Sequence, residues 1–304
     1  MKVILSGGTG FIGRALCKRL LQDQHEVVLL TRNPGAVTSS LSDKLRFRLW
    51  DAQTLGPWRE SIEGADAVVN LAGEPVTAKR WTQAQKERIM ASRVQATRAM
   101  VGAIAKADRK PLVLVNASAV GYYGHVMEET VTEEAAKGKG FLADVCEAWE
   151  GEARKAESFG VRVVLLRTGV VLGEQGGVLE KIIPPFRYFV GGPAGSGKQW
   201  FPWIHLEDVT GSIVFALHDR NLRGPVNVTS PNPVRMKAFC EQLGAVMHRP
   251  AWIPVPAMVL RILYGEMADV LLGGQRAIPQ KLKAAGHPFR YPDLAAALLT
   301  MIKE

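Results

Sequence analysis

The chain has 304 residues, of which 47% are hydrophobic and 22% charged, so it can bury a large core and is neither disordered nor fibrous. Its formal net charge of +9 suits nucleic acid, a membrane surface or an anionic small ligand, and does not choose among them. The three cysteines lie far apart without a Cys-x-x-Cys pair, which argues against a disulfide framework or a zinc cluster and predicts a reduced, cytoplasmic location. No stretch has the pattern of a signal peptide or a membrane span.

Short apolar runs alternate with longer helical patterns along the first half of the chain. The sequence predicts strands at residues 2–6, 26–31, 67–72, 112–117 and 161–167, and helices at residues 11–22 and 82–106. This alternation is typical of βαβ units that stack into a parallel sheet. The expected fold class is therefore α/β, with a doubly wound parallel sheet of the Rossmann type.

Glycines and prolines change the character of the chain after Gly173. They interrupt any regular pattern, and we expect residues 184–199 to form a loop that helps to cover the site. A helix start at residues 207–208, a strand near 226–228 and a mostly helical remainder follow. We predict a Rossmann domain at residues 1–174, completed by about 206–229, and a smaller, mostly helical C-terminal substrate domain at residues 175–205 and 230–304.

A glycine-rich run, Gly7 to Gly13 (GGTGFIG), connects the first predicted strand to the first predicted helix. In that context the spacing of Gly7, Gly10 and Gly13 predicts a dinucleotide site, because the glycines allow a tight turn, close approach of a pyrophosphate and close helix packing. The helix that begins at Phe11 and Ile12 would hold the phosphates with its free N–H groups and its dipole.

The second predicted strand ends at Thr31 and Arg32, about 20 residues beyond the glycines. An enzyme that uses NAD places Asp or Glu there, against the ribose 2′-hydroxyl. An arginine can instead form a charge-assisted contact with a 2′-phosphate, so the sequence favours NADP(H) over NAD.

Other candidate residues follow the ends of later strands, where ligands of open α/β sheets bind. Residues 70–73 (NLAG) would let a nicotinamide ribose approach the backbone, residues 116–124 (NASAVGYYG) supply a serine and two tyrosines, and residues 167–173 (RTGVVLG) close another strand.

Several short sequence motifs together resemble those of a known family. They are residues 71–75 (LAGEP), 80–81 (RW), 121–124 (GYYG), 166–172 (LRTGVVL), 184–187 (PPFR) and 273–276 (GGQR). They resemble the extended short-chain dehydrogenase/reductase superfamily, and within it an atypical, epimerase-like subfamily, the YfcH-type epimerase family. The resemblance runs from residue 1 to about 300 and implies an NADP(H)-binding Rossmann domain followed by a small substrate domain.

The chain departs from the superfamily at its catalytic positions. The superfamily uses a Tyr-x-x-x-Lys pair for proton transfer, and the alignment puts Phe141 and Val145 there, neither of which transfers a proton. Arg93 stands at the position of a catalytic asparagine, and only a serine, Ser118, is retained. The candidate catalytic residues are Ser118, Tyr122, Tyr123 and Arg93. The candidate cofactor-binding residues are Gly7, Gly10, Phe11, Ile12, Gly13, Thr31, Arg32, Leu71, Ala72, Gly73, Arg93 and Leu172.

Two functions remain open at this point. In the first, the protein is an NADP(H)-dependent oxidoreductase or epimerase-like enzyme that acts on a small substrate, and an anionic group on this substrate would suit the basic chain. Ser118 would bind a substrate oxygen. Tyr122 or Tyr123 would be the acid/base, assisted by Arg93. In the second, the tyrosines are packing residues, and the protein is an inactive NADP(H)-binding sensor or scaffold for a protein partner.

The remaining motifs predict little chemistry. The six histidines show no metal-ligand spacing, and we expect His205 to order the chain near a helix start. Basic residues are spread along the chain and no RNA or DNA motif is present, so neither a metal nor a nucleic acid is expected as a ligand.

Overall fold

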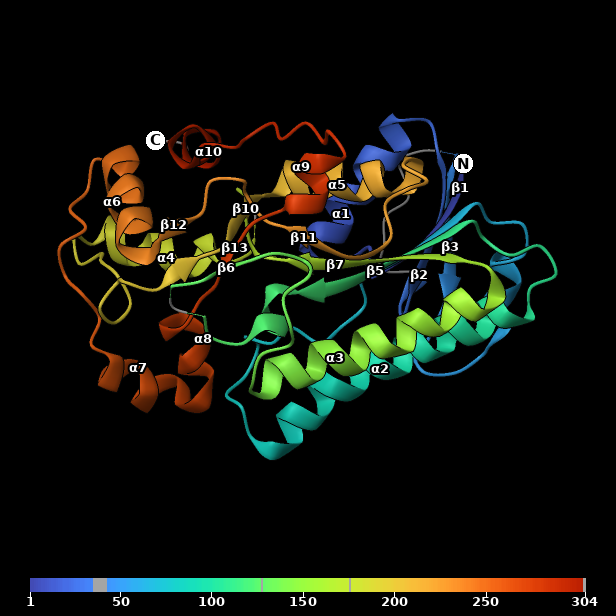
Figure 1. Ribbon diagram of the computed structural model, residues 1–304, viewed down its shortest axis with the longest axis horizontal. Coiled ribbons are helices and arrows are strands. Elements are labelled where there is room, and N and C mark those ends of the chain that lie inside the picture. Colours follow the sequence, from blue (N-terminus) through green and yellow to red (C-terminus); the bar gives the residue numbers. More distant parts are fainter. Residues whose placement is uncertain (35–42, 127, 175, 303–304) are drawn as a thin grey trace.

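A seven-stranded parallel sheet forms the centre of the molecule in the computed structural model, which describes residues 1–34, 43–126, 128–174 and 176–302 (Figure 1). The strand order is β3-β2-β1-β4-β5-β7-β11. The strands are β1 (Lys2–Ser6), β2 (Glu26–Thr31), β3 (Leu45–Leu49), β4 (Ala67–Asn70), β5 (Val113–Ala119), β7 (Arg162–Thr168) and β11 (Gly224–Val228). The order reverses at β1 and β4, and ligands of such sheets bind beyond the carboxyl ends of the strands there.

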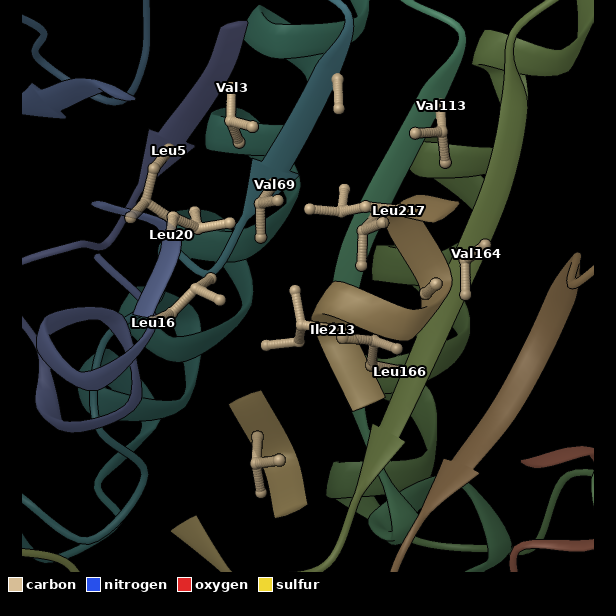
Figure 2. Close-up of a cluster of buried hydrophobic side chains, with 14 of the residues drawn as sticks. Val3, Leu5, Leu16, Leu20, Val69, Val113, Val164, Leu166, Ile213 and Leu217 are labelled. Atoms are coloured by element: carbon tan, nitrogen blue, oxygen red, sulfur yellow. The ribbon is translucent and has the colours of Figure 1, made fainter. Parts of the chain in front are cut away.

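Helices cover both faces of the sheet (Figure 1). On one face lie α1 (Phe11–Gln22) and α5 (Leu206–His218), and on the other lie α2 (Gln83–Lys106) and α3 (Phe141–Arg154). Figure 2 shows side chains of α1 and α5 packed on the first face of the sheet. They are Leu16, Leu20, Ile213 and Leu217, set against Val3, Leu5, Val69, Val113, Val164 and Leu166. Burial of each such side chain contributes about 1.5–3 kcal/mol, which fixes these helices and the loops that precede them.

A smaller unit follows the carboxyl ends of the strands. Its core is formed by α4 (Leu179–Arg187), α6 (Met236–Met247) and α10 (Leu294–Met301). Three pairs of short strands lie outside the central sheet. They are β8 (Val170–Leu172) with β10 (Trp203–His205), β9 (Trp200–Phe201) with β12 (Val234–Arg235), and β6 (Thr130–Val131) with β13 (Arg276–Ala277). The remaining helices are α7 (Ala257–Tyr264), α8 (Ala268–Leu272) and α9 (Gln280–Ala284).

The structure confirms the expected fold class and corrects several element boundaries. The strand expected at residues 67–72 ends at Asn70, and β3 was not expected. The loop expected at residues 184–199 begins inside α4, which contains Pro184 and Pro185. Burial of Leu179 and Phe186 stabilises this helix, which explains why packing overrides the usual effect of proline.

His205 has the structural role that the sequence predicts. Its Nδ1 accepts a hydrogen bond from the backbone N–H of Glu207 at 3.1 Å, so the ring caps the N-terminus of α5. Within the described part of the chain, no helix is both long enough and apolar enough to cross a membrane.

Candidate functional site

The glycine loop lies between β1 and α1, and its glycines are required by close backbone contacts. Gly7 has a positive φ of 71°, and a Cβ on it would lie 2.6 Å from the carbonyl oxygen of Leu71. A Cβ on Gly13 would lie 2.2 Å from the carbonyl oxygen of Gly7. No side chain larger than hydrogen fits at either position, so the loop stays tight against the end of β4.

The first turn of α1 presents free hydrogen-bond donors. Gly10 is the N-cap residue and supplies no side-chain acceptor, and the first turn contains no acidic residue. The first N–H groups of a helix have no acceptor inside the helix, so those at Phe11, Ile12 and Gly13 are available to an anion. This arrangement fits a pyrophosphate.

Arg32 lies just beyond the end of β2 and is exposed. It has no hydrogen-bond or ion-pair partner among the described residues, whereas Thr31 accepts a hydrogen bond from the backbone N–H of Asn33 at 3.3 Å. The free guanidinium fits a phosphate on the adenosine ribose.

Two other predicted cofactor residues pack within the protein. The Phe11 ring fills the space that side chains at Gly173 and Gly176 would need, since a Cβ at these positions would lie 2.8 and 2.7 Å from the ring. Leu172 is fully buried in the core of the smaller unit, so its side chain is not available to a ligand. The prediction for Leu172 therefore applies only to its backbone.

A network of uncharged polar side chains connects the ends of three adjacent strands. Ser6 donates to Asn70 Oδ1 at 2.6 Å, and Asn70 Nδ2 donates to Asn116 Oδ1 at 2.7 Å and to Thr97 Oγ1 at 2.9 Å. Trp149 Nε1 donates to the same Thr97 oxygen at 2.9 Å. These satisfied hydrogen bonds hold β1, β4 and β5 against α2 and α3, which gives the site a rigid base.

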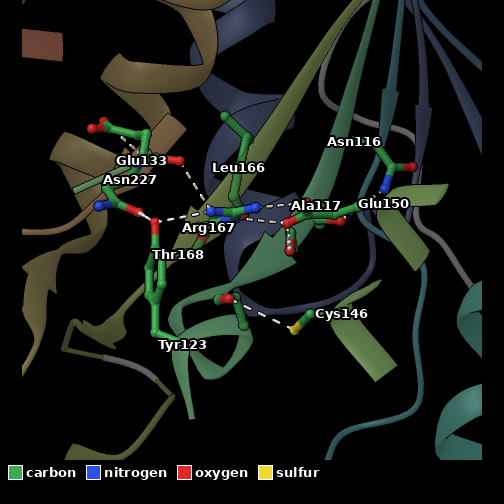
Figure 3. Close-up of polar contacts among 12 residues, drawn as sticks. Asn116, Ala117, Tyr123, Glu133, Cys146, Glu150, Leu166, Arg167, Thr168 and Asn227 are labelled. Atoms are coloured by element: carbon green, nitrogen blue, oxygen red, sulfur yellow. Dashed lines mark hydrogen bonds and ion pairs between the residues drawn. The ribbon is translucent and has the colours of Figure 1, made fainter. Parts of the chain in front are cut away.

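A second buried network contains two of the predicted catalytic residues (Figure 3). Glu150 and Arg167 form a two-pronged ion pair with both N···O distances at 2.9 Å, and each is almost completely buried. Ser118 donates to Glu150 Oε1 at 2.7 Å. Arg167 Nη1 donates to the Tyr123 hydroxyl at 3.1 Å, and that hydroxyl donates to Asn227 Oδ1 at 2.6 Å. We call Ser118, Tyr123, Glu150, Arg167 and Asn227 the buried cluster.

Tyr123 is poorly suited to proton transfer. Burial raises its pKa to about 12, although Arg167 acts in the opposite direction. Its hydroxyl is already engaged on both sides, so a substrate would have to displace Asn227 to reach the proton. Ser118 is likewise committed to Glu150. The geometry therefore argues against Tyr123 as the acid/base and against Ser118 as a substrate ligand.

Tyr122 differs from its neighbour. It is half-buried, and its hydroxyl has no hydrogen-bond partner among the residues that the structure describes. Its ring stacks on the guanidinium of Arg167, 3.4 Å from the ring centroid, and packs edge-on against Tyr123. Tyr122 is thus held in place while its hydroxyl remains free.

The residues that the resemblance aligns with the superfamily's catalytic positions lie on two helices. Phe141 and Val145 lie at the start of α3; Phe141 packs edge-on against Trp81, with ring centroids 5.1 Å apart, and Val145 is buried. Arg93 lies on α2, with its guanidinium over the Trp149 ring at 5.0 Å and next to Gly73. Among the described residues, no group of acidic, histidine or cysteine side chains could hold a metal ion.

Sequence reasoning did not find Glu150 or Asn227, and it noted Arg167 only as part of a strand end. A signal was present, because Arg167 follows the apolar run Val163 to Leu166 and Glu150 lies on the apolar face of its helix. Opposite charges at positions that the pattern buries have to be paired.

Comparison with known proteins gives a consistent result over nearly the whole chain. Residues 3–228 match the NAD dependent epimerase/dehydratase family, and residues 255–300 match a domain of unknown function, DUF1731. The chain is 43% identical to the chloroplastic epimerase family protein SDR39U1 homolog of Arabidopsis thaliana, covering 100% of this chain and 87% of that protein. It is 39% identical to the epimerase family protein YfhF of Bacillus subtilis, covering 100% and 99%.

Solved structures show the same likeness. Human epimerase family protein SDR39U1, solved with NADPH, superposes with a TM-score of 0.88 at 35% identity and covers 99% of both chains. A UDP-glucuronic acid 4-epimerase of Bacillus cereus, solved with NAD, has a TM-score of 0.81 at 17% identity and covers 99% of this chain and 98% of that one. This second likeness concerns the fold alone.

Proposed function

The chain belongs to the NAD dependent epimerase/dehydratase family, and we propose that it is an NADP(H)-dependent oxidoreductase that acts on a small molecule at the carboxyl ends of β1, β4 and β5. The glycine loop, the free N–H groups of α1 and Arg32, which has no partner in the part of the chain that the structure describes, support NADP(H) as its cofactor. The human relative solved with NADPH supports the same assignment.

Bound NADPH would supply a hydride for a substrate carbonyl. The carbonyl oxygen then needs one proton to become a hydroxyl, and a nearby side chain has to donate it. We assign this role to Tyr122. The observation that carries the assignment is that its hydroxyl has no hydrogen-bond partner among the described residues, whereas the hydroxyls of Ser118 and Tyr123 are bound within the buried cluster.

A pair of tyrosine variants tests the proposal. Single-turnover oxidation of NADPH would be followed in the wild type, Tyr122→Phe and Tyr123→Phe with a panel of small aldehydes and ketones. Loss of general acid catalysis lowers a rate by about 10²–10⁴-fold, so we expect a fall of about 100-fold or more in Tyr122→Phe with NADPH affinity unchanged. Tyr123→Phe serves as the matched control and should keep most of the rate. An unchanged rate in Tyr122→Phe would exclude its role.

A second candidate function is a catalytically silent NADP(H)-binding sensor or scaffold that regulates a protein partner. The alignment with the superfamily, which puts Phe141 and Val145 at the positions of its proton-transferring pair, favours this function. Tight binding of NADPH by the wild type without oxidation in the presence of any carbonyl substrate would support this second function.

A further inference from the structure

Arg93 is a largely buried cation that lacks a carboxylate partner among the residues that the structure describes. Its Nη1 donates to the backbone carbonyl oxygens of Glu74 at 2.9 Å and Ile89 at 3.1 Å. No ion pair joins it to an acidic side chain among the described residues, and burial lowers its pKa more than the charge of Glu74 raises it. Enclosing a guanidinium without a counter-charge is unfavourable, so the site is electrostatically incomplete as it stands.

Two of the three guanidinium nitrogens remain available. Neither Nε nor Nη2 of Arg93 has a hydrogen-bond partner among the described residues, and neither belongs to the polar atoms that are sealed from solvent without a partner. Adjacent N–H groups of an arginine match the two oxygens of a carboxylate or phosphate. The free edge of Arg93 therefore has the geometry of an anion receptor.

The surroundings hold this receptor rigidly. The guanidinium packs over the Trp149 ring, and the indole N–H of Trp149 is itself bonded to Thr97. A Cβ on Gly73 would lie 3.1 Å from Arg93 Cζ, so this glycine lets the guanidinium pack against the loop that follows β4. A pre-positioned guanidinium loses little conformational entropy when it binds an anion.

Arg93 also lies on the side of the sheet where the proposed reaction takes place. Cys146, one turn before Trp149 on α3, donates a hydrogen bond to the carbonyl oxygen of Ala119. Ala119 is the last residue of β5 and directly precedes the turn that carries Tyr122. Arg93 is thereby linked to the loop after β4 and, through α3, to the end of β5.

We propose that Arg93 binds a carboxylate or phosphate group of the substrate, which makes the substrate class a small anionic carbonyl or alcohol. This inference rests on the proposed function, since it concerns the substrate of the same site. A phosphate of the cofactor is the other source of the same chemistry, and the experiment separates the two sources.

The test uses Arg93→Gln, Arg93→Lys and the control Arg98→Gln on the full chain. Arg98 lies on the same helix, but its side chain is exposed and paired with Glu152. NADPH affinity would be measured by fluorescence titration. The protein saturated with NADP⁺ would then be titrated calorimetrically with oxalate and with inorganic phosphate. We expect Arg93→Gln to weaken the binding of oxalate or of phosphate tenfold or more, and Arg93→Lys to restore part of that affinity. Arg98→Gln should leave the affinity for both anions unchanged.

The two sources give different results. NADPH affinity within twofold of the wild type, together with weakened anion binding, supports a substrate anion. A tenfold or greater loss of NADPH affinity would assign Arg93 to a cofactor phosphate and overturn the substrate assignment. If the wild type binds neither anion, or if all variants bind anions and NADPH alike, the inference is wrong. None of these titrations needs turnover, so they remain interpretable if Tyr122 proves inactive. Thermal melting identifies a variant that has lost its fold, and Arg93→Lys then supplies the comparison.

Discussion

The glycine loop and the buried cluster lie along the same edge of one sheet, yet their polar groups are used in opposite ways. At the loop, the N–H groups of the first turn of α1 and the side chain of Arg32 have no partner among the described residues and are available to an anion. In the cluster, Ser118, Tyr123 and Glu150 satisfy one another. A residue type known for catalysis is therefore informative only when its polar atoms are available.

The cluster also differs from the loop in what it contributes to stability. An ion pair removed from water is stabilising only while both partners are present and fully hydrogen-bonded. Glu150 and Arg167 meet this condition, because the carboxylate also accepts from Ser118 and the guanidinium also donates to Tyr123. The cluster therefore acts as a structural centre that connects β5, β7, β11 and α3, and it holds Tyr122 through the ring of that residue.

The largest expected effect comes from Glu150→Gln. This variant leaves Arg167 charged and unpaired in the interior, which costs about 3–5 kcal/mol. Urea denaturation should show a fall of this size in the free energy of unfolding. Glu147→Gln on the same helix is the matched control, because Glu147 is 60% exposed and pairs with Lys137 at the surface. A loss below about 1 kcal/mol in Glu150→Gln would mean that the cluster is not a structural centre.

The next effect tests the loop and is measured as binding. Arg32→Ala removes a charge-assisted hydrogen bond worth about 1.5–3 kcal/mol, so NADPH affinity should fall roughly ten- to a hundredfold while NADH affinity barely changes. Fluorescence titrations with both cofactors measure this. Arg19→Ala, at the far end of α1 and paired with Asp23, should change neither. Equal losses of affinity for NADPH and NADH in Arg32→Ala would show that Arg32 does not bind the 2′-phosphate.

Most of the sheet could be predicted from the sequence because its signals are local. The apolar strands and the glycine spacing that opens α1 depend on a few neighbouring residues, and they predicted the fold class correctly. The helix α4 could not be predicted, since the packing that offsets Pro184 and Pro185 comes from Phe186 against a distant core. The short strand β3 alternates apolar residues with arginines, a pattern typical of a half-buried strand, so its signal was present in the sequence and was overlooked.

The site was less predictable because availability depends on residues distant in sequence. Alignment retained Ser118 as a catalytic serine, but its hydroxyl is committed to Glu150, 32 residues away. Tyr122 and Tyr123 are adjacent in the sequence, and only the fold shows that Asn227 engages one hydroxyl and leaves the other free. The sequence gives the type of each residue, whereas its hydrogen-bond partners are known only from the tertiary structure.

The smallest expected effect is a pH dependence of stability that differs between the two faces of the sheet. One face carries α1 and α5 and lies behind the glycine loop. The other carries α2 and α3 and lies behind the buried cluster. His205 caps α5 and His287 packs against Phe215 of that helix, and burial lowers the pKa of each histidine to about 4. The unfolded chain, with a pKa near 6.5, binds these protons first, so stability is complete above about pH 6.5 and declines as the pH falls toward 4.

At pH 5.5 each of these histidines should lower the free energy of unfolding by about 1 kcal/mol relative to pH 7.5. The denaturant midpoint measured across this range checks the loss, and His287→Gln, which cannot titrate, should reduce the pH dependence by about half. Hydrogen exchange would show where in the fold acid reduces stability. As the pH falls, amides of α5 should lose protection before those of α3, because the buried cluster, to which α3 belongs, contains no histidine. The same pH dependence in His287→Gln as in the wild type would contradict the role of His287, and uniform loss of protection would mean that the two faces respond to acid as one cooperative unit.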